Sequence, residues 1–399
     1  MANQKASLLA VLLPILLYSI FRFSVGPILP SMQAAYAISY ASAGYIVSLS
    51  IGMVGIGTGI SGIIARRFGD RNTVLFGLLL FAFPVIVLTI LSSNYLIFAT
   101  LFIFSGLGCG LMTTPTYSIA ATIFPHRKGA AIGFVSAAYN IGAFIGPVLT
   151  GSLSGYFSWT VPLATIGLLG FVFSIILFSA LRSLKPTAQR TDRRIGLRKF
   201  LGNRSFVIVM ISMILGDFAF LSFITWTPEF LLRALSNQMS LTSIDAYFGV
   251  AVGLGGVGVT MAGLLLDRIG GKRSTLLGSA FATFSVVGLF LSDSLVTVLA
   301  FMFFAGFFSN WFWGLLSTMA QSYVSSERKT DAVALAQTAA FVGAFTGPAA
   351  AGLLTASFNI GSALLLVVSL PYAALTILML FLHDDRPIRA LDHASFSRS

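Results

Sequence analysis

The sequence predicts an all-α membrane protein with twelve transmembrane helices in two equivalent halves. Hydrophobic residues make up 57% of the 399-residue chain and charged residues only 9%, whereas a soluble domain has about 25% charged residues. The 37 Phe and 39 Gly fit helices that face lipid and pack closely through small residues. The apolar runs are long and continuous, so they favour helices over the alternating strands of a membrane barrel.

The order of the expected helices follows from these runs. A transmembrane helix needs roughly 20 apolar residues, and twelve runs are long enough. They lie near 7–29, 41–65, 72–91, 95–123, 129–153, 160–182, 205–232, 243–266, 273–292, 295–323, 331–355 and 360–382. Prolines inside several runs should bend the helices without ending them, because neighbouring helices can satisfy the freed backbone groups.

A basic loop motif occurs twice at a fixed separation, which indicates an internal duplication. Residues 263–273 read GLLLDRIGGKR, and a weaker copy, GIIARRFGDRN, occupies residues 62–72. The two motifs are 201 residues apart, counted from Gly62 to Gly263. Two further pairs keep the same separation: Arg127 with Arg328, and Gly146 with Gly347. A repeat of this length sets the architecture of the whole chain.

The duplication predicts three segments. We expect an N-terminal six-helix bundle at 1–182, a basic linker at 183–204, and a C-terminal six-helix bundle with a short tail at 205–399. The linker, with its excess of Lys and Arg, is interpreted either as a tether beside anionic lipid head groups or as a regulatory site.

The basic residues predict the orientation in the membrane. If the N-terminus is inside, only Arg22 and Arg233 of the 24 Lys and Arg fall outside the inner segments. By the positive-inside rule both termini should be cytoplasmic, in a multi-pass protein of the inner or plasma membrane. The net charge of +12 is therefore a topology signal, and we expect no nucleic-acid partner.

The repeated pattern resembles the major facilitator superfamily over nearly the whole chain. The resemblance rests on twelve spans in two six-helix repeats, on GxxxDRxGGKR after the second helix of a repeat, and on Gly-Pro motifs in the fifth and eleventh helices. It implies the major facilitator fold, with two bundles of three-helix inverted repeats, a central cavity and alternating access. We expect a monomer without a cofactor, and the single Cys109 excludes an internal disulfide and a cysteine metal site.

The first loop departs from the family motif. Arg66 stands where the family has Asp, whereas the second loop keeps Asp267. One interpretation is a swapped polarity, in which Arg66 approaches Asp331 at the start of the eleventh helix, while Asp267 faces Arg127; a helix N-terminus favours an acid. The other is that Arg66 only follows the positive-inside pattern. The predicted loop residues are Arg66, Asp70, Arg127, Asp267, Arg268 and Asp331.

Two charged residues fall well inside predicted spans, and charges there are usually retained for a function. Asp217 lies 13 residues after Arg204, about 20 Å along a helix, and Arg22 lies toward the outer half of the first span. Arg22 can capture an anionic group, because guanidinium matches a carboxylate; alternatively it snorkels to the interface or pairs with Asp217. Asp217 is either a proton carrier or a neutral structural acid.

The other candidates for a substrate site are polar or aromatic side chains of the spans, which are more often packing residues. Together with Arg22, the predicted substrate-binding residues are Tyr18, Asn140, Trp226, Asn310 and Gln337.

Three functions fit these residues. The first is a proton-coupled symporter of a small organic anion such as a monocarboxylate. In this function the partners of the protein are the anion, protons and the surrounding membrane lipids. The second is a proton-coupled exporter of drugs or metabolites, and the third is a sensor or lipid-moving protein on the same fold. A single basic residue in the cavity argues against phosphate esters. An enzyme is not expected, because His126, His383 and His393 fall outside the spans and no nucleophile–base pair lies within one.

Overall fold

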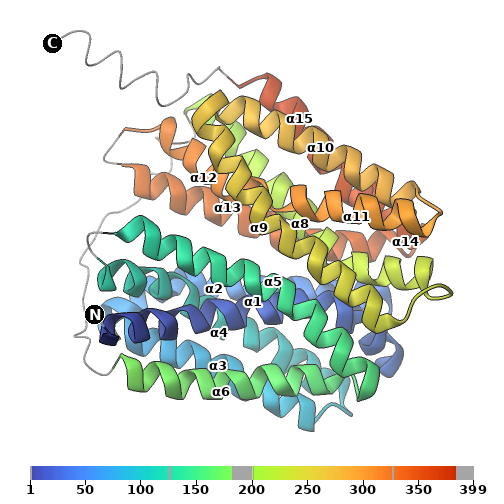
Figure 1. The fold of residues 1–399 in the computed structure, drawn as a ribbon, viewed down its shortest axis with the longest axis horizontal. Coiled ribbons are helices and arrows are strands. Elements are labelled where there is room, and N and C mark those ends of the chain that lie inside the picture. The colour runs from blue at the N-terminus through green and yellow to red at the C-terminus, as the bar shows by residue number, and fades with distance from the viewer. Residues whose placement is uncertain (1, 125–126, 182–199, 201, 326–327, 383–399) are drawn as a thin grey trace. The chain divides into compact units, whose positions relative to one another are not determined.

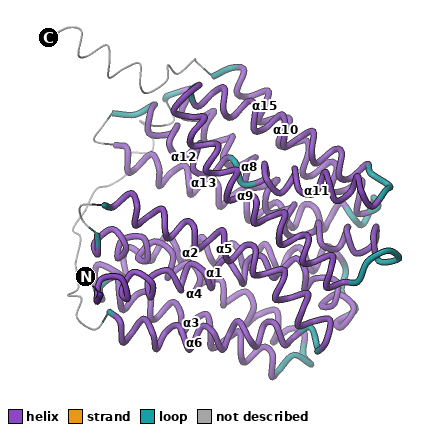
Figure 2. Tube along the Cα trace, viewed as in Figure 1, coloured by secondary structure: helices purple, strands orange, loops and turns teal. Residues whose placement is uncertain are grey.

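The computed structural model describes residues 2–124, 127–181, 200, 202–325 and 328–382. Every regular element in these ranges is helical, with short loops between (Figure 2). Twelve helices are long and apolar enough to cross a membrane, which confirms the predicted fold class. Most of the expected linker, and the three histidines, lie outside the described residues.

The chain divides into two compact units (Figure 1). The first contains Met1–Asp192 together with Met239–Gly249, and the second contains Arg193–Gln238 with Val250–Ser399. One helix, α9, therefore begins in the first unit and continues in the second.

The first unit contains six long helices and the first turns of α9. Its helices are α1 (Ala2–Tyr36), α2 (Tyr40–Phe68), α3 (Asp70–Ile90), α4 (Tyr95–Ile123), α5 (Lys128–Tyr156) and α6 (Thr160–Ala180), with α9 starting at Leu241. Helix α4 packs against both α2 and α3, while α1 packs against α5 and α3 against α6. Long apolar helices have no polar face to expose, so they bury their smallest side chains against one another.

The second unit repeats this packing. Helix α9 spans Leu241–Ile269, and its part from Val250 onward belongs to this unit. The other elements are α8 (Arg204–Leu235), α10 (Gly271–Leu291), α11 (Leu295–Ser309), α12 (Phe312–Ser322), α13 (Lys329–Leu354), α14 (Ile360–Leu364), the π-helical turn η2 (Leu365–Ser369) and α15 (Leu370–Leu380). Helix α8 packs on α13 as α1 packs on α5, and α10 packs on α11 as α3 packs on α4.

The two basic loops have the same backbone conformation. Gly69 between α2 and α3 has φ 82°, and Gly270 between α9 and α10 has φ 87°. Both values lie in the left-handed region, which glycine adopts at little cost and other residues avoid. The shared conformation supports the duplication that the motifs predict.

Similar close approaches hold helices together in both units. A Cβ added to Gly106 of α4 would lie 2.2 Å from the carbonyl oxygen of Ser50, and one added to Gly306 of α11 would lie 2.2 Å from that of Ala251. Only glycine permits backbones to come this near.

The tenth span differs from the sequence expectation of one continuous helix over 295–323. It is interrupted at Asn310 and Trp311, between α11 and α12. The break places the buried indole of Trp311 against Gly278 of α10, where its Nε1 donates a hydrogen bond of 3.1 Å to the Ser274 carbonyl. The gain from burying and satisfying this large side chain offsets the lost helical bonds.

Candidate functional site

The first group of predicted site residues lies on α1. Tyr18 and Arg22 are one helical turn apart, so both project from the same face. Arg22 Nη1 donates a hydrogen bond of 2.9 Å to Tyr18 Oη, and the guanidinium carbon is 5.9 Å from the centre of the Tyr18 ring. Tyr18 is buried and Arg22 half-buried. The phenol therefore orients the guanidinium from one side.

Residues of α5 and α4 lie beside this pair. The Tyr139 ring of α5 lies 6.1 Å from the Tyr18 ring, and Cys109 of α4 is close enough to Arg22 for an electrostatic interaction. Asn140 is half-buried beside Tyr139 and donates to the carbonyl of Ser136, one turn back on its own helix, at 3.1 Å. The structure thus places Arg22, Tyr18 and Asn140 on neighbouring helices of one unit.

The second unit holds Asp217 on α8. The side chain is 7% exposed and interacts electrostatically with Tyr372 of α15. Tyr372 is fully buried, and its hydroxyl donates to the Ser309 carbonyl at 3.2 Å. Because Ser309 is the last residue of α11, Asp217 lies near the interruption of the tenth span.

The remaining predicted binding residues occupy different environments in the second unit. Trp226 is fully buried on α8, and its Nε1 donates a hydrogen bond of 2.9 Å to the Pro348 carbonyl of α13. This bond fits a packing role for Trp226, because a buried indole N–H needs an acceptor. Asn310 directly follows the last residue of α11, and Gln337 is half-buried on α13. Their contact with a substrate stays a prediction.

The predicted loop residues belong to two separate loop systems. In the first unit, Asp70 begins α3 and accepts a hydrogen bond of 2.6 Å from Ser118 Oγ of α4, while Arg66 and Arg127 are exposed. In the second unit, Asp267 and Arg268 are exposed, and Asp331 lies in the first turn of α13. The pairings of Arg66 with Asp331 and of Arg127 with Asp267 would join the units, and they stay predictions.

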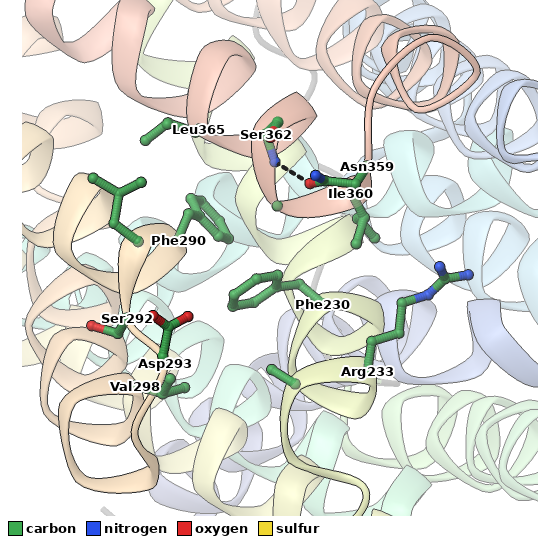
Figure 3. A pocket seen from close by; sticks show the side chains of 13 residues that line it. Phe230, Arg233, Phe290, Ser292, Asp293, Val298, Asn359, Ile360, Ser362 and Leu365 are labelled. Carbon is green, nitrogen blue, oxygen red and sulfur yellow. Dashed lines mark hydrogen bonds between the residues drawn. The ribbon is translucent and has the colours of Figure 1, made fainter.

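The second unit contains an ion pair that was not predicted from the sequence. Glu229 and Arg233 of α8 form a salt bridge of 2.7 Å, and the carboxylate side chain is only 7% exposed. The two residues are four apart, a spacing at which helical side chains meet. Arg233 borders a cavity of about 420 Å³, which is lined by the end of α8, the α10–α11 loop and the start of α14. Figure 3 shows Arg233, Asp293 and Asn359 around this cavity.

A second acid was also missed. Asp245 lies in the second turn of α9 and is 1% exposed. Asp245 was not predicted as a site residue, because it falls at the edge of the expected span at 243–266, where a charge can reach the interface. A comparison of the two halves of the sequence could have pointed to Asp245, since the equivalent residue in the first half is Gly44. Among the described residues, no cluster of His, Cys, Asp and Glu could hold a metal ion.

Comparisons with known proteins agree on one family. The model of the Major Facilitator Superfamily matches residues 11–296 and 235–397. A multidrug efflux protein of Bacillus subtilis is 24% identical over 84% of this chain and 83% of its own length. Monocarboxylate transporter 9 of Rattus norvegicus is 26% identical over 37% of this chain and 29% of its own. An uncharacterised transporter of Mycobacterium tuberculosis is 29% identical, and the match spans 25% of its length and 35% of this chain.

Solved structures share the fold at low sequence identity. A bacterial homologue of the human lysosomal transporter Spinster, in an inward-facing and unoccupied conformation, has a TM-score of 0.78 and 16% identity, with 95% of each chain covered. A D-xylose–proton symporter has a TM-score of 0.76 and 18% identity, with 95% of this chain and 97% of that chain covered.

Proposed function

The chain belongs to the major facilitator superfamily of membrane transporters, and we propose that it is a proton-coupled symporter of a small organic anion, such as a monocarboxylate. The observation that carries this proposal is the half-buried Arg22, oriented by Tyr18 within the membrane-spanning part of α1. A cation at this depth is costly without a role or a partner.

The chemistry of Arg22 favours a carboxylate. Guanidinium presents a planar fork of N–H donors that matches the two oxygens of a carboxylate, and such charge-assisted bonds are stronger than neutral ones. Within the candidate span of α1, Ser7–Tyr36, Arg22 is the only basic residue. One positive charge suits a monoanion, whereas a phosphate ester would call for two or more basic groups.

Asp217 is the proposed proton carrier. It is a buried acid on α8, and α8 occupies in the second half the position of α1 in the first. Neutralisation of Arg22 by the bound anion would favour protonation of Asp217, so substrate and proton would cross together. The match to a monocarboxylate transporter supports this proposal, although it covers only a third of the chain.

An exporter is the second candidate function. The Bacillus relative named as a multidrug efflux protein matches most of the chain, and in that case Asp217 would meet cationic or neutral apolar compounds. The presence of Arg22 disfavours an exporter of cations, because a half-buried guanidinium repels cations. The two candidates therefore differ in the charge of the ligand.

A ligand screen on purified protein separates the candidates. The thermal unfolding of the detergent-solubilised protein is followed with a thiol-reactive dye, because the only thiol, Cys109, is fully buried until the protein unfolds. Small carboxylates should raise the unfolding temperature of the wild type and of Arg233→Ala, but not of Arg22→Ala. Stabilisation by organic cations, without stabilisation by carboxylates, would replace the symporter with the exporter.

A further inference from the structure

The carboxyl group of Asp245 is buried without a hydrogen-bond partner. The residue is 1% exposed, and neither Oδ1 nor Oδ2 has a partner in the described part of the chain. Polar groups that are removed from water nearly always find a partner. An ionised carboxylate in this position would lose its hydration without compensation, whereas a neutral carboxylic acid loses much less.

The backbone of α5 closes this position from the opposite side. A Cβ added to Gly151 would lie 2.5 Å from Asp245 Cβ and 2.9 Å from Asp245 Oδ2. Thr242, one turn earlier on α9, donates a hydrogen bond of 3.0 Å from Oγ1 to the Gly151 carbonyl. The first turns of α9 and the last turns of α5 therefore meet along a tight seam, formed by Thr242 and Asp245 on one side and Gly151 on the other.

The titratable groups around the seam are few. Beyond its first turn α5 carries Tyr139 and Tyr156 and no acid or base, and the start of α9 carries Tyr247. Helix α1, which also packs on α5, contributes Arg22. Its neighbours Ile20, Phe23 and Ser24 face Gly146, which lies five residues before Gly151, about 7 Å along the helix.

The duplicated sequence shows that the fold does not need this acid. Gly44 occupies the equivalent position of α2 in the first half. A buried acid in only one of two equivalent positions carries a cost that helix packing does not explain, and it indicates a role in the transport cycle.

We propose that Asp245 is a second proton-binding residue of the transporter, protonated while α9 lies against α5 and ionised when the seam opens to water. One proton is taken up from the solution when the seam closes, and the same proton returns when it opens. Low pH would therefore hold the seam closed. The proposal extends the proposed function by adding a proton site, and it holds whether or not the substrate is an anion.

The separation of α5 and α9 can be measured against pH. Spin labels are attached to cysteines at positions 156 and 247 in a Cys109→Ser background, because Tyr156 and Tyr247 are 83% and 42% exposed. Distances are recorded by pulsed electron resonance in lipid nanodiscs without substrate. We expect the distance to lengthen as the pH rises, and Asp245→Asn to keep the short distance at every pH, because the amide cannot ionise.

Two matched variants test the seam itself. Gly151→Ala should give the long distance even at low pH, because its methyl group would collide with Asp245, whereas Gly133→Ala on the same helix should behave as the wild type, since an added Cβ meets nothing within 4 Å. If Gly151→Ala does not fold, Asp245→Asn still decides the outcome.

Asp217→Asn separates this proposal from the proposed function. The pH-dependent change should persist in that variant, even if carboxylate transport proves absent. A wild-type distance between the two labels that does not change with pH would overturn the role of Asp245. The same holds if the distance in Asp245→Asn changes with pH as it does in the wild type.

Discussion

The guanidinium of Arg71 donates a hydrogen bond of 2.9 Å to the main-chain carbonyl of Phe178, close to the end of α6. In the second unit the equivalent residue, Lys272, donates to the carbonyls of Leu382 at 2.7 Å and Leu380 at 3.4 Å, at the end of α15. The last carbonyls of a helix have no partner within it, and a basic side chain also suits the negative end of the helix dipole. A basic side chain of each loop therefore caps the C-terminus of the final helix of its own unit.

Replacement of Arg71 by Leu should destabilise the first unit. The substitution removes the charge-assisted bond and the contact of the guanidinium with the Phe178 ring at 4.8 Å. Such bonds contribute about 1.5–3 kcal/mol, so the unfolding temperature, read from the reaction of Cys109 with a thiol dye, should fall. Arg67→Leu is the control, since its exposed guanidinium lies over its own neighbour Phe68. If both substitutions lower the unfolding temperature equally, the hydrogen bond from Arg71 to the end of α6 does not explain the loss of stability.

Substitution of Gly270 by Ala should also destabilise the protein. At φ 87° a side chain is strained, at a cost on the order of 1–3 kcal/mol. The control is Gly263→Ala on α9, where an added Cβ meets nothing within 4 Å and where Ala favours the helix. Thermal unfolding followed by tryptophan fluorescence should show opposite shifts, and a neutral Gly270→Ala would contradict the strained turn.

The sequence predicted the helices and their duplication because both depend on local composition. Continuous apolar runs require helices in lipid, and the motifs at 62–72 and 263–273 mark equivalent loops, whose glycines share one conformation. The interruption at Trp311 was not predictable in this way. No Gly or Pro stands at that point, and the break depends on how the indole fits against Gly278 in a neighbouring helix.

The candidate site was predictable only in part, for a similar reason. The contact of Tyr18 with Arg22 follows from their spacing on one helix. Asp245 became visible only when the structure showed its burial against α5, since burial depends on a helix far away in sequence.

A charge exchange tests the proposed swapped loop. Arg66→Asp alone should reduce transport or stability, because it would bring two acids together if Arg66 approaches Asp331. Adding Asp331→Arg should recover part of the loss, with a coupling of about 0.5–3 kcal/mol. Uptake and unfolding temperature are measured for both single variants and the double variant. If the losses of the two single variants simply add in the double variant, Arg66 does not pair with Asp331 and only follows the positive-inside pattern.

The hydroxyl of Tyr18 should contribute to anion binding. Tyr18→Phe removes the acceptor of the 2.9 Å bond from Arg22, and loss of one such bond costs about 0.5–1.5 kcal/mol. The affinity for a carboxylate, measured by titration calorimetry, should therefore fall by roughly 2- to 13-fold. Tyr45→Phe, on an exposed side chain of α2, should leave the affinity unchanged. An unchanged affinity in Tyr18→Phe would mean that the phenol does not orient the guanidinium for binding.

Asp217→Asn and Arg22→Ala should fail in different ways. Arg22→Ala should lose carboxylate binding at any pH, because it removes the proposed anion-binding cation. Asp217→Asn should still bind the anion, since a neutral amide imitates the protonated acid. It should also exchange substrate in counterflow, but lose accumulation under an inward proton gradient in proteoliposomes.

A suitable control for Asp217→Asn is Asp293→Asn, in the α10–α11 loop of the same unit, which should accumulate substrate as the wild type does. Accumulation by Asp217→Asn under the gradient would exclude Asp217 as the proton carrier. Normal carboxylate binding by Arg22→Ala would exclude the anion site and favour the exporter, because the charge that distinguishes the two functions would then have no part in recognition.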